Sequence, residues 1–352
     1  MTACRPERTD APRHRRRPLQ GQGAHDLMTR RILVTGGAGF IGSAYVRALL
    51  GPAGPPGIEV TVLDALTYAG SLTRLESVTG DPRLSFVHGD VLDARSVERL
   101  AAQHEDIVHF AAESHVDRSI ASGAAFTRTN VMGTQTLLDA VLRQGTRTFV
   151  QVSTDEVYGD LPAGAATEDS PLSPNSPYAA SKAAADHVAL AHHRTHGLDV
   201  RVTRCSNNFG AYQHPEKLIP RFVAALFSGG KVPVYGDGLQ VRDWLSVDDH
   251  VRGIELVRTA GRAGRVYNIG GGTSLTNLDL THRLLELCGA GPDRIEHVED
   301  RKGHDRRYAV DHTRITQELG YRPSGDFERA LTRTVAWYRE HPHWWRPLYE
   351  AA

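Results

Sequence analysis

The chain has 352 residues, of which 40% are hydrophobic and 23% charged, an ordinary composition for a folded globular protein. Lysine plus arginine and aspartate plus glutamate both number 41, so the formal net charge is zero. Nucleic acids and anionic membranes attract basic surfaces, so this balance argues against either as the main partner. The sequence has no apolar run long enough to span a bilayer, and we expect a cytoplasmic protein.

Residues 1–28 form an Arg-rich extension without the apolar stretch of a secretory signal. We predict that this extension is disordered; a basic binding arm, or translation that starts at Met28, are the alternatives. The three cysteines, Cys4, Cys205 and Cys288, are far apart and odd in number. This pattern indicates reduced thiols, and we expect neither a disulfide framework nor a metal site.

Short apolar stretches alternate with helical patterns up to about residue 205. The expected strands span residues 31–35, 59–64, 84–90, 106–112, 148–153 and 200–204. The expected helices span residues 43–50, 96–103 and about 126–144, and another begins at Pro177. Strands that alternate with helices form parallel βαβ units. We therefore predict an α/β fold: a Rossmann-like doubly wound parallel sheet with a smaller, mixed C-terminal substrate-binding domain.

A glycine-rich turn, with Gly36, Gly39 and Gly42 at regular spacing, separates the first expected strand from the first helix. Glycines there allow a tight turn and let the backbone approach a pyrophosphate at the N-terminus of the helix. The alternative is an ordinary strand-to-helix turn, which rarely needs three spaced glycines. Asp64 ends the second strand, where an acid binds ribose hydroxyls and repels a 2′-phosphate, which favours NAD over NADP. Capping of a turn is the other interpretation of Asp64, and Asp90, after the third strand, is a candidate adenine contact.

We accordingly assign residues 29–205 to an NAD-binding Rossmann domain. We assign residues 206–345 mainly to substrate binding, with part of this region returning to the sheet.

Tyr178 and Lys182 form a YxxxK pattern on the helix that begins at Pro177. Positions four apart lie on one helix face, so both side chains can point at one substrate. A nearby ammonium favours phenolate, and we expect it to lower the pKa of Tyr178 and make it a usable base. Only four of the 41 basic residues are lysines, so Lys182 stands where this chain would normally use Arg. An exposed helical pair is the alternative.

Thr154, Asp155 and Glu156 follow the fifth expected strand, at the edge of the sheet where open α/β folds bind ligands. Two adjacent acids can divide proton transfer if their surroundings separate their pKa values. The alternative is a helix N-terminus that acids stabilise through the dipole.

From about Arg31 to Trp345, the chain resembles the extended short-chain dehydrogenase/reductase family and, within it, the dTDP-glucose 4,6-dehydratases. The resemblance is carried by Thr35–Gly42, Leu66–Gly70, Ala111–Ser119, Ser153–Gly159, Tyr178–Lys182, Cys205–Asn208, Pro215–Pro220 and Arg301–Asp305. The Thr-Asp-Glu step is the most specific of these segments, because related epimerases and decarboxylases share the glycines and YxxxK but lack the acid pair.

The resemblance implies a lyase that uses tightly bound NAD to convert dTDP-glucose into dTDP-4-keto-6-deoxyglucose. Tyr178, assisted by Lys182 and Thr154, would act in oxidation at C4. Glu156 would remove the C5 proton and Asp155 would protonate the departing C6 hydroxyl, after which C6 is reduced. The ketone at C4 is needed first because it acidifies the C5 proton, so a redox cofactor serves an elimination.

The resemblance also implies two further sets of contacts. Besides the glycines, Asp64, Tyr178 and Lys182, it assigns to the cofactor Phe40, Ile41, Asp90, Val91, Ala111, Ala112, Thr129 and Asn208. Besides Thr154, it assigns to the substrate Ser114, Asn207, Lys217, Leu218, Tyr235, Arg242, Asn277, Arg301 and His304.

Two other functions stay open at this point: a related nucleotide-sugar epimerase or decarboxylase, and a non-catalytic NAD-binding protein on the same fold. Family membership further implies a homodimer formed through the Tyr178 helix and the helix at about 126–144.

Overall fold

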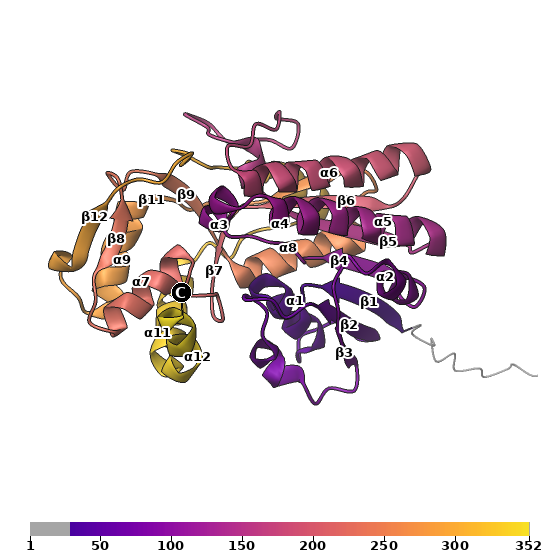
Figure 1. The fold of residues 1–352 in the computed structure, drawn as a ribbon, viewed down its shortest axis with the longest axis horizontal. Coiled ribbons are helices and arrows are strands. Elements are labelled where there is room, and N and C mark those ends of the chain that lie inside the picture. Colours follow the sequence, from indigo (N-terminus) through magenta and orange to yellow (C-terminus); the bar gives the residue numbers. More distant parts are fainter. Residues whose placement is uncertain (1–28, 352) are drawn as a thin grey trace, which may run out of the picture.

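The computed structural model describes residues 29–351 (Figure 1). The predicted disordered extension, residues 1–28 with Cys4, lies outside the described residues. None of the helices within 29–351 is both long and apolar enough to cross a membrane.

The core of the molecule is a seven-stranded sheet with the order β10-β6-β5-β4-β1-β2-β3. Its strands are β1 (Arg30–Thr35), β2 (Ile58–Asp64), β3 (Leu84–His88), β4 (Asp106–His109), β5 (Thr148–Thr154), β6 (Val200–Cys205) and β10 (Val266–Ile269). Every neighbouring pair is parallel. The predicted Rossmann-like doubly wound sheet is thus confirmed. The strand β10 comes from the second half of the chain and pairs with β6.

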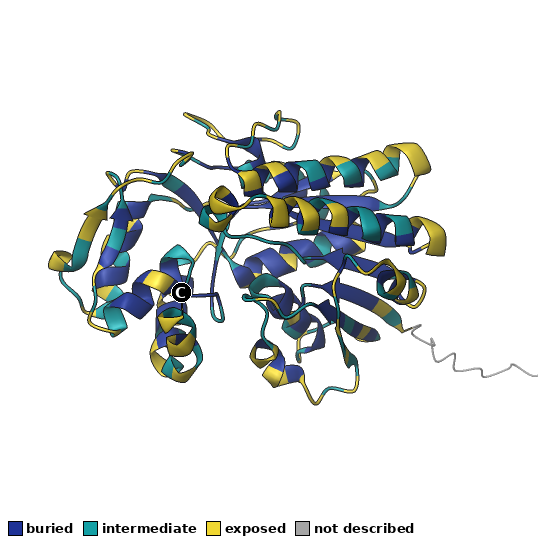
Figure 2. Cartoon of the chain, viewed as in Figure 1, coloured by how far each residue is buried: buried dark blue, intermediate teal, exposed yellow. Residues whose placement is uncertain are grey.

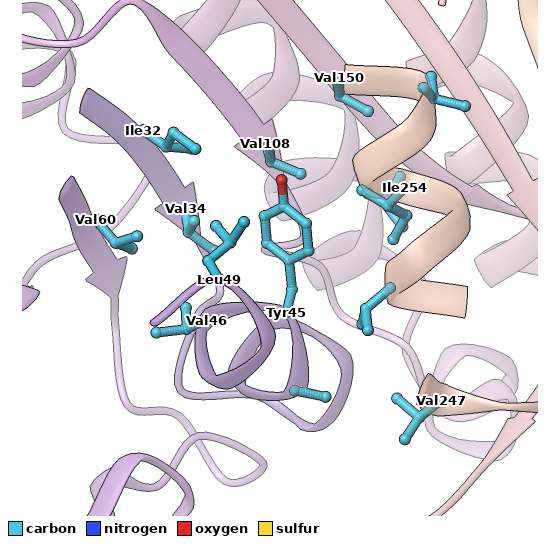
Figure 3. Packing of buried hydrophobic residues seen from close by; sticks show 14 of the residues in the cluster. Ile32, Val34, Tyr45, Val46, Leu49, Val60, Val108, Val150, Val247 and Ile254 are labelled. Carbon is cyan, nitrogen blue, oxygen red and sulfur yellow. The ribbon is translucent and has the colours of Figure 1, made fainter. Parts of the chain in front are cut away.

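Helices cover both faces of this sheet. One face carries α1 (Phe40–Leu50), α8 (Val247–Ala260) and α10 (Thr313–Leu319); the other carries α2 (Ala94–Ala101), α5 (Gly133–Gln144) and α6 (Pro177–His196). Successive side chains of a strand point to opposite faces. Ile32 and Val34 accordingly join the α1/α8 cluster, whereas Leu33 joins the α2/α5/α6 cluster. Figure 3 shows the first cluster, in which Tyr45 of α1 and Ile254 of α8 meet over the sheet.

The predicted helix at 126–144 is interrupted in its first half. The short helix α4 (Ala124–Phe126) leads into a π-helical turn, η2 (Thr127–Met132), before α5 begins. Such wide turns recur at functional sites, and this one contains Thr129, which lines the cavity described below. The strands predicted at 84–90 and 106–112 end early, at His88 and His109, and the residues that follow them form loops above the sheet edge.

The remaining elements form a smaller body with its own apolar core, on the left of Figure 1. It contains a three-stranded sheet, β7 (Asn207–Phe209), β9 (Val241–Ser246) and β11 (Ser274–Thr276), and a two-stranded one, β8 (Val232–Tyr235) with β12 (Ile295–Val298). Its helices are α7 (Leu218–Phe227), α9 (Asn277–Cys288), η4 (Pro292–Arg294), α11 (Phe327–Glu340) and α12 (Pro342–Glu350). Asn207 and Asn208, which follow the last strand expected from the sequence, pair with β9 in the short strand β7.

Three short helices complete the chain near the junction of the two bodies: η1 (Leu72–Val78), α3 (Val116–Ala121) and η3 (Asp155–Tyr158). Figure 2 shows that the buried residues concentrate in the central sheet and at this junction, whereas the outer sides of α5 and α6 are exposed. The junction is where the carboxyl ends of the central strands meet the smaller body.

Candidate active site

A cavity of about 320 Å³ lies above the carboxyl ends of the central strands. Every residue predicted to contact the cofactor lines it: Gly36, Gly39, Phe40, Ile41, Gly42, Asp64, Asp90, Val91, Ala111, Ala112, Thr129, Tyr178, Lys182 and Asn208. The proposed catalytic residues Thr154, Asp155 and Glu156 line it as well. The cavity therefore brings the expected cofactor and reaction groups into one space.

The glycine turn between β1 and α1 leaves no room for side chains at two positions. Gly36 has φ +70°, and a Cβ added to it would lie 2.6 Å from the backbone nitrogen of Ala111. A Cβ on Gly42 would lie 2.3 Å from the carbonyl oxygen of Gly36. Gly39 precedes α1 and provides no side-chain cap, so no side chain covers the first amides of the helix. Free amides at a helix N-terminus bind anions, so the turn fits the pyrophosphate of a dinucleotide.

Asp64 serves the turn and faces the cavity. Its Oδ2 accepts a hydrogen bond from the Ala38 amide at 2.9 Å, and its Oδ1 accepts one from the Leu66 amide at 2.8 Å. Both interpretations of this residue thus have a structural basis, because a carboxylate oxygen can accept a further bond from a ribose hydroxyl.

Tyr178 and Lys182 lie on α6, whose first turn is capped by the Ser176 hydroxyl. The Lys182 ammonium donates to the carbonyl oxygen of Val152 at 2.7 Å, which fixes it against β5. Burial, followed by the neighbouring charge of Glu156, raises the pKa of Tyr178 well above its ordinary value. Our expectation of a lowered pKa was wrong for the protein's own residues, because burial of the phenolate and the nearby negative charges dominate.

Thr154 ends β5, and its hydroxyl accepts a hydrogen bond from the Glu156 amide at 3.2 Å. This cap starts η3 and directs the two acids that follow into the cavity. The buried Oδ2 of Asp155 has no hydrogen-bond partner among residues 29–351. Such an oxygen is costly to bury unless a ligand satisfies it.

The surroundings of the two carboxyl groups differ in charge. Burial raises the pKa of Asp155 well above its ordinary value, and the charges of Glu156 and Asp243 add to this effect. Burial also raises the pKa of Glu156, but the positive charges of Arg301, Lys217 and Arg242 oppose it. The arrangement favours a protonated Asp155 next to an ionised Glu156, which is a donor beside an acceptor.

The predicted substrate contacts fall into two groups. Ser114, Thr154, Asn207 and Lys217 line the cavity, and the Lys217 ammonium donates to the carbonyl oxygen of Ser114 at 2.7 Å. The second group lies in the smaller body, outside the cavity wall: Leu218, Tyr235, Arg242, Asn277, Arg301 and His304.

Members of the second group make aromatic contacts or carry buried polar atoms. The rings of Tyr235 and His304 meet edge to face at 6.1 Å. The Arg242 guanidinium lies 4.3 Å above the Tyr308 ring. The Nε atom of Arg301 and Oδ1 of Asn277 are buried, and neither has a hydrogen-bond partner within the described part of the chain.

Sequence reasoning missed some residues of the cavity wall, among them Glu113, Cys205, Ser206, Gln213, His214 and Glu216. Cys205 and Ser206 could have been found, because they end β6 at the same edge as the acids. Asp243 could not, since its influence on Asp155 depends on the folding of β9 behind the cavity.

Comparison with known proteins identifies the family. The family model described as GDP-mannose 4,6 dehydratase matches residues 33–334. A dTDP-glucose 4,6-dehydratase of Streptomyces griseus is 64% identical over 324 residues, which cover 92% of this chain and 98% of that protein. The crystal structure of a dTDP-glucose 4,6-dehydratase from Streptomyces venezuelae with NAD bound is 60% identical, with a TM-score of 0.89 over 90% of this chain and 99% of that one.

A UDP-glucose 4-epimerase from Thermotoga maritima shares the fold at a TM-score of 0.81 but only 31% identity, over 88% of this chain and 99% of that one. The chain is thus about twice as identical in sequence to the dehydratases as to this epimerase. The chain belongs to the GDP-mannose 4,6 dehydratase family and, within it, to the dTDP-glucose 4,6-dehydratases.

Proposed function

We propose that the protein converts dTDP-glucose into dTDP-4-keto-6-deoxyglucose and water, with NAD as a tightly bound cofactor that is regenerated in each turnover. The observation that carries this proposal is the pairing of Asp155 and Glu156 in one cavity with Tyr178 and Lys182. Epimerisation at C4 needs a base such as Tyr178 but does not need the acid pair. Elimination of water needs both a base and an acid.

The cofactor would be held by the glycine turn at its pyrophosphate, by Asp64 at its adenosine ribose and by Asp90 at its adenine. The carboxylate of Asp64 disfavours a 2′-phosphate, which supports NAD rather than NADP. When bound, NAD supplies the hydride acceptor at C4 and the hydride donor at C6.

Tyr178 would remove the proton of the C4 hydroxyl, with Thr154 as a hydrogen-bonding partner of its oxygen. Lys182 is buried one helical turn away, and its ammonium is held in place by its hydrogen bond to the carbonyl oxygen of Val152. A cationic group at this place favours the phenolate form that must exist for the proton to move.

Glu156 would then take the C5 proton, which the C4 ketone has acidified. Asp155 would give its proton to the C6 hydroxyl, so that the C6–O bond breaks and water leaves. The unpaired Oδ2 of Asp155 is the atom available for this contact. The pKa of Asp155 is raised well above its ordinary value and cations surround Glu156, which supports these roles because the acid must start neutral and the base ionised.

The nucleotide part of the substrate would extend toward the smaller body. Arg242 and Arg301 suit its pyrophosphate, since a guanidinium binds two phosphate oxygens in parallel. We accordingly propose residues 29–205 as the NAD-binding domain and residues 206–345 as mainly substrate-binding.

The test is turnover of dTDP-glucose in deuterated water, followed by mass spectrometry and by the alkaline absorbance of the 4-keto product. We expect loss of water and one solvent deuterium retained at C5. Glu156→Gln should stop deuterium incorporation and lower turnover by about 10²–10⁴-fold. A 4-epimer or carbon dioxide as the product would overturn the proposal in favour of an epimerase or decarboxylase. If NAD binds but none of dTDP-, UDP-, GDP- or CDP-glucose reacts, the protein is a non-catalytic NAD-binding protein.

We also propose a homodimer that forms through α5 and α6. Met132 and Leu142 are large apolar residues on the α5 side, and they are 54% and 41% exposed. A second copy that covers these helices would bury them. Light scattering should give twice the chain mass, and Met132→Asp together with Leu142→Asp should give the monomer. Wild-type protein that stays monomeric at all concentrations would refute this assembly.

We propose a cytoplasmic location. The support is that Cys205 and Cys288 are both free thiols, which is typical of proteins in a reducing compartment.

A further inference from the structure

A single buried arginine joins three loops of the cavity wall. Arg74, on η1, is 2% exposed, and within residues 29–351 its side chain donates hydrogen bonds only to backbone carbonyls. Its Nη1 donates to Ala69 at 2.8 Å and to Ala38 at 3.4 Å, and its Nε donates to Tyr212 at 3.0 Å. Ala38 belongs to the glycine turn, Ala69 to the loop after β2, and Tyr212 to the loop after β7.

The loop that contains Tyr212, one of the three that Arg74 joins, has a strained backbone. Tyr212 has φ +67°, a conformation that residues other than glycine rarely adopt. Its ring is held by Trp337 at 4.5 Å, by Trp344 at 5.5 Å and by the Arg47 guanidinium at 4.7 Å. The aromatic residues of α11 and α12 therefore fix the carbonyl that Arg74 binds.

The Arg47 and Trp344 side chains also support Arg74 directly. Arg47 donates to the carbonyl oxygen of Arg74 at 2.5 Å, and the Arg74 guanidinium lies 5.1 Å above the Trp344 ring. Trp344 in turn donates from its indole to the Thr73 hydroxyl at 3.1 Å. The smaller body is thereby attached to the two loops that hold the cofactor's pyrophosphate and ribose under the proposed function.

We propose that Arg74 is a positioning residue for cofactor retention, which keeps the three loops closed around NAD between the two hydride transfers. This inference rests on the proposed function, in which the hydride taken from C4 must return to C6 from the same cofactor. A cofactor that leaves in between would strand the reaction intermediate. A planar guanidinium can bind three carbonyls in fixed directions, whereas the compact ammonium of lysine cannot.

The test measures NAD that stays with the purified holoenzyme during extended gel filtration, together with the rate of NAD dissociation. Arg74→Lys keeps the charge and should release NAD roughly ten- to a hundredfold faster, as expected for lost charge-assisted hydrogen bonds. Excess NAD should restore most of the turnover. Arg201→Lys is the matched control, because Arg201 is also buried and donates to the carbonyls of Val257 at 2.7 Å and Arg258 at 2.6 Å, away from the cavity.

Equal NAD retention by wild type and Arg74→Lys would overturn the inference. The proposed function would still stand if the wild type turns over dTDP-glucose. Equal losses in Arg74→Lys and Arg201→Lys would also overturn it, because they would indicate general loosening. If Arg74→Lys does not fold, Trp344→Leu at a half-buried position replaces it and should release NAD faster as well. Wild-type protein that retains no NAD would refute both the inference and the proposed function.

Discussion

The buried carboxyl group of Asp155, which the proposed reaction needs, lowers the stability of the native state at neutral pH. Its carboxyl is buried with one oxygen unpaired, and its pKa is raised well above the usual value by burial and by the charges of Glu156 and Asp243. In an unfolded chain the same group titrates near pH 4, at about 3.9. Above that pH, unfolding releases a proton, so the stability of the native state falls as pH rises toward the raised pKa.

We therefore expect Asp155→Asn to be inactive in elimination yet more stable than wild type at neutral pH, by a few degrees in Tm. An amide mimics the protonated acid and has no proton to lose. The gain should shrink as pH is lowered toward about 4, where the wild-type carboxyl is protonated in both states.

Calorimetry of both proteins across this pH range checks the expectation. Glu76→Gln, an exposed substitution on η1, is the control and should follow wild type throughout. A stability gain of Asp155→Asn that does not change with pH would show that the effect comes from packing and not from the carboxyl's titration.

At the residue scale, sequence reasoning was strongest where function depends on position along a strand or helix. Thr154 ends β5 and Asp155 comes directly after it, so their position along the chain placed them. Tyr178 and Lys182 share a face of α6 through their spacing of four residues. The raised pKa of Tyr178 was not predictable, because it depends on how much of the side chain the fold buries. The position of Arg74 was equally hidden, since its three acceptors are spread between residues 38 and 212.

At the scale of elements, the regular alternation of apolar stretches and helical patterns predicted the strands of the first half and that they are parallel. The π turn η2 and the short strand β7 left no pattern in the sequence. A strand of three residues such as β7 exists because β9 is beside it, and that neighbour is supplied by the fold.

The turn between β1 and α1 gives a prediction that separates stability from NAD binding. One of its glycines is required by packing, and another lies in front of the helix amides. Gly42 lies inside α1, where a Cβ would come within 2.3 Å of the Gly36 carbonyl oxygen. Gly42→Ala should therefore destabilise the protein by about 1–3 kcal/mol, as overpacking does. Gly39 precedes the helix in an extended conformation, and its added Cβ would lie 3.1 Å from the same oxygen.

Gly39→Ala should thus fold with nearly the wild-type Tm but bind NAD more weakly, because its methyl group occupies the approach to the free helix amides. Thermal unfolding and calorimetric titration with NAD separate the two effects. If Gly39→Ala binds NAD as tightly as wild type, the pyrophosphate does not approach the turn at this residue.

At the scale of the whole molecule, a buried ionic network joins the two halves of the chain on the side opposite the cavity. Asp106, at the start of β4, is fully buried and accepts hydrogen bonds from Arg30 of β1 and Arg258 of α8. Arg258 also pairs with Glu255, which accepts a hydrogen bond from the Tyr45 hydroxyl of α1 at 2.7 Å. Figure 3 shows Tyr45 among the apolar side chains on the face of the sheet that α1 and α8 cover.

Asp106→Asn would leave the buried Arg258 guanidinium with only one acidic partner. Removing one member of a buried ion pair costs about 3–5 kcal/mol, and the lower end applies here because Glu255 remains. We expect the midpoint of urea unfolding to fall while the urea dependence of the unfolding free energy stays the same. Hydrogen exchange in α8 should speed up, since this helix loses its link to the sheet.

NAD retention and turnover at low temperature should stay at the wild-type level, because the cavity lies at the other ends of the strands. The neighbouring pair Arg31–Glu105 gives the matched control: it also joins β1 to the start of β4, but in a solvent-accessible position. Glu105→Gln should change stability little, as is usual for exposed ion pairs. If both variants lower the stability equally, strand pairing holds β1 and β4 together at this end of the sheet, and the buried charges of Asp106 and Arg258 add no stability.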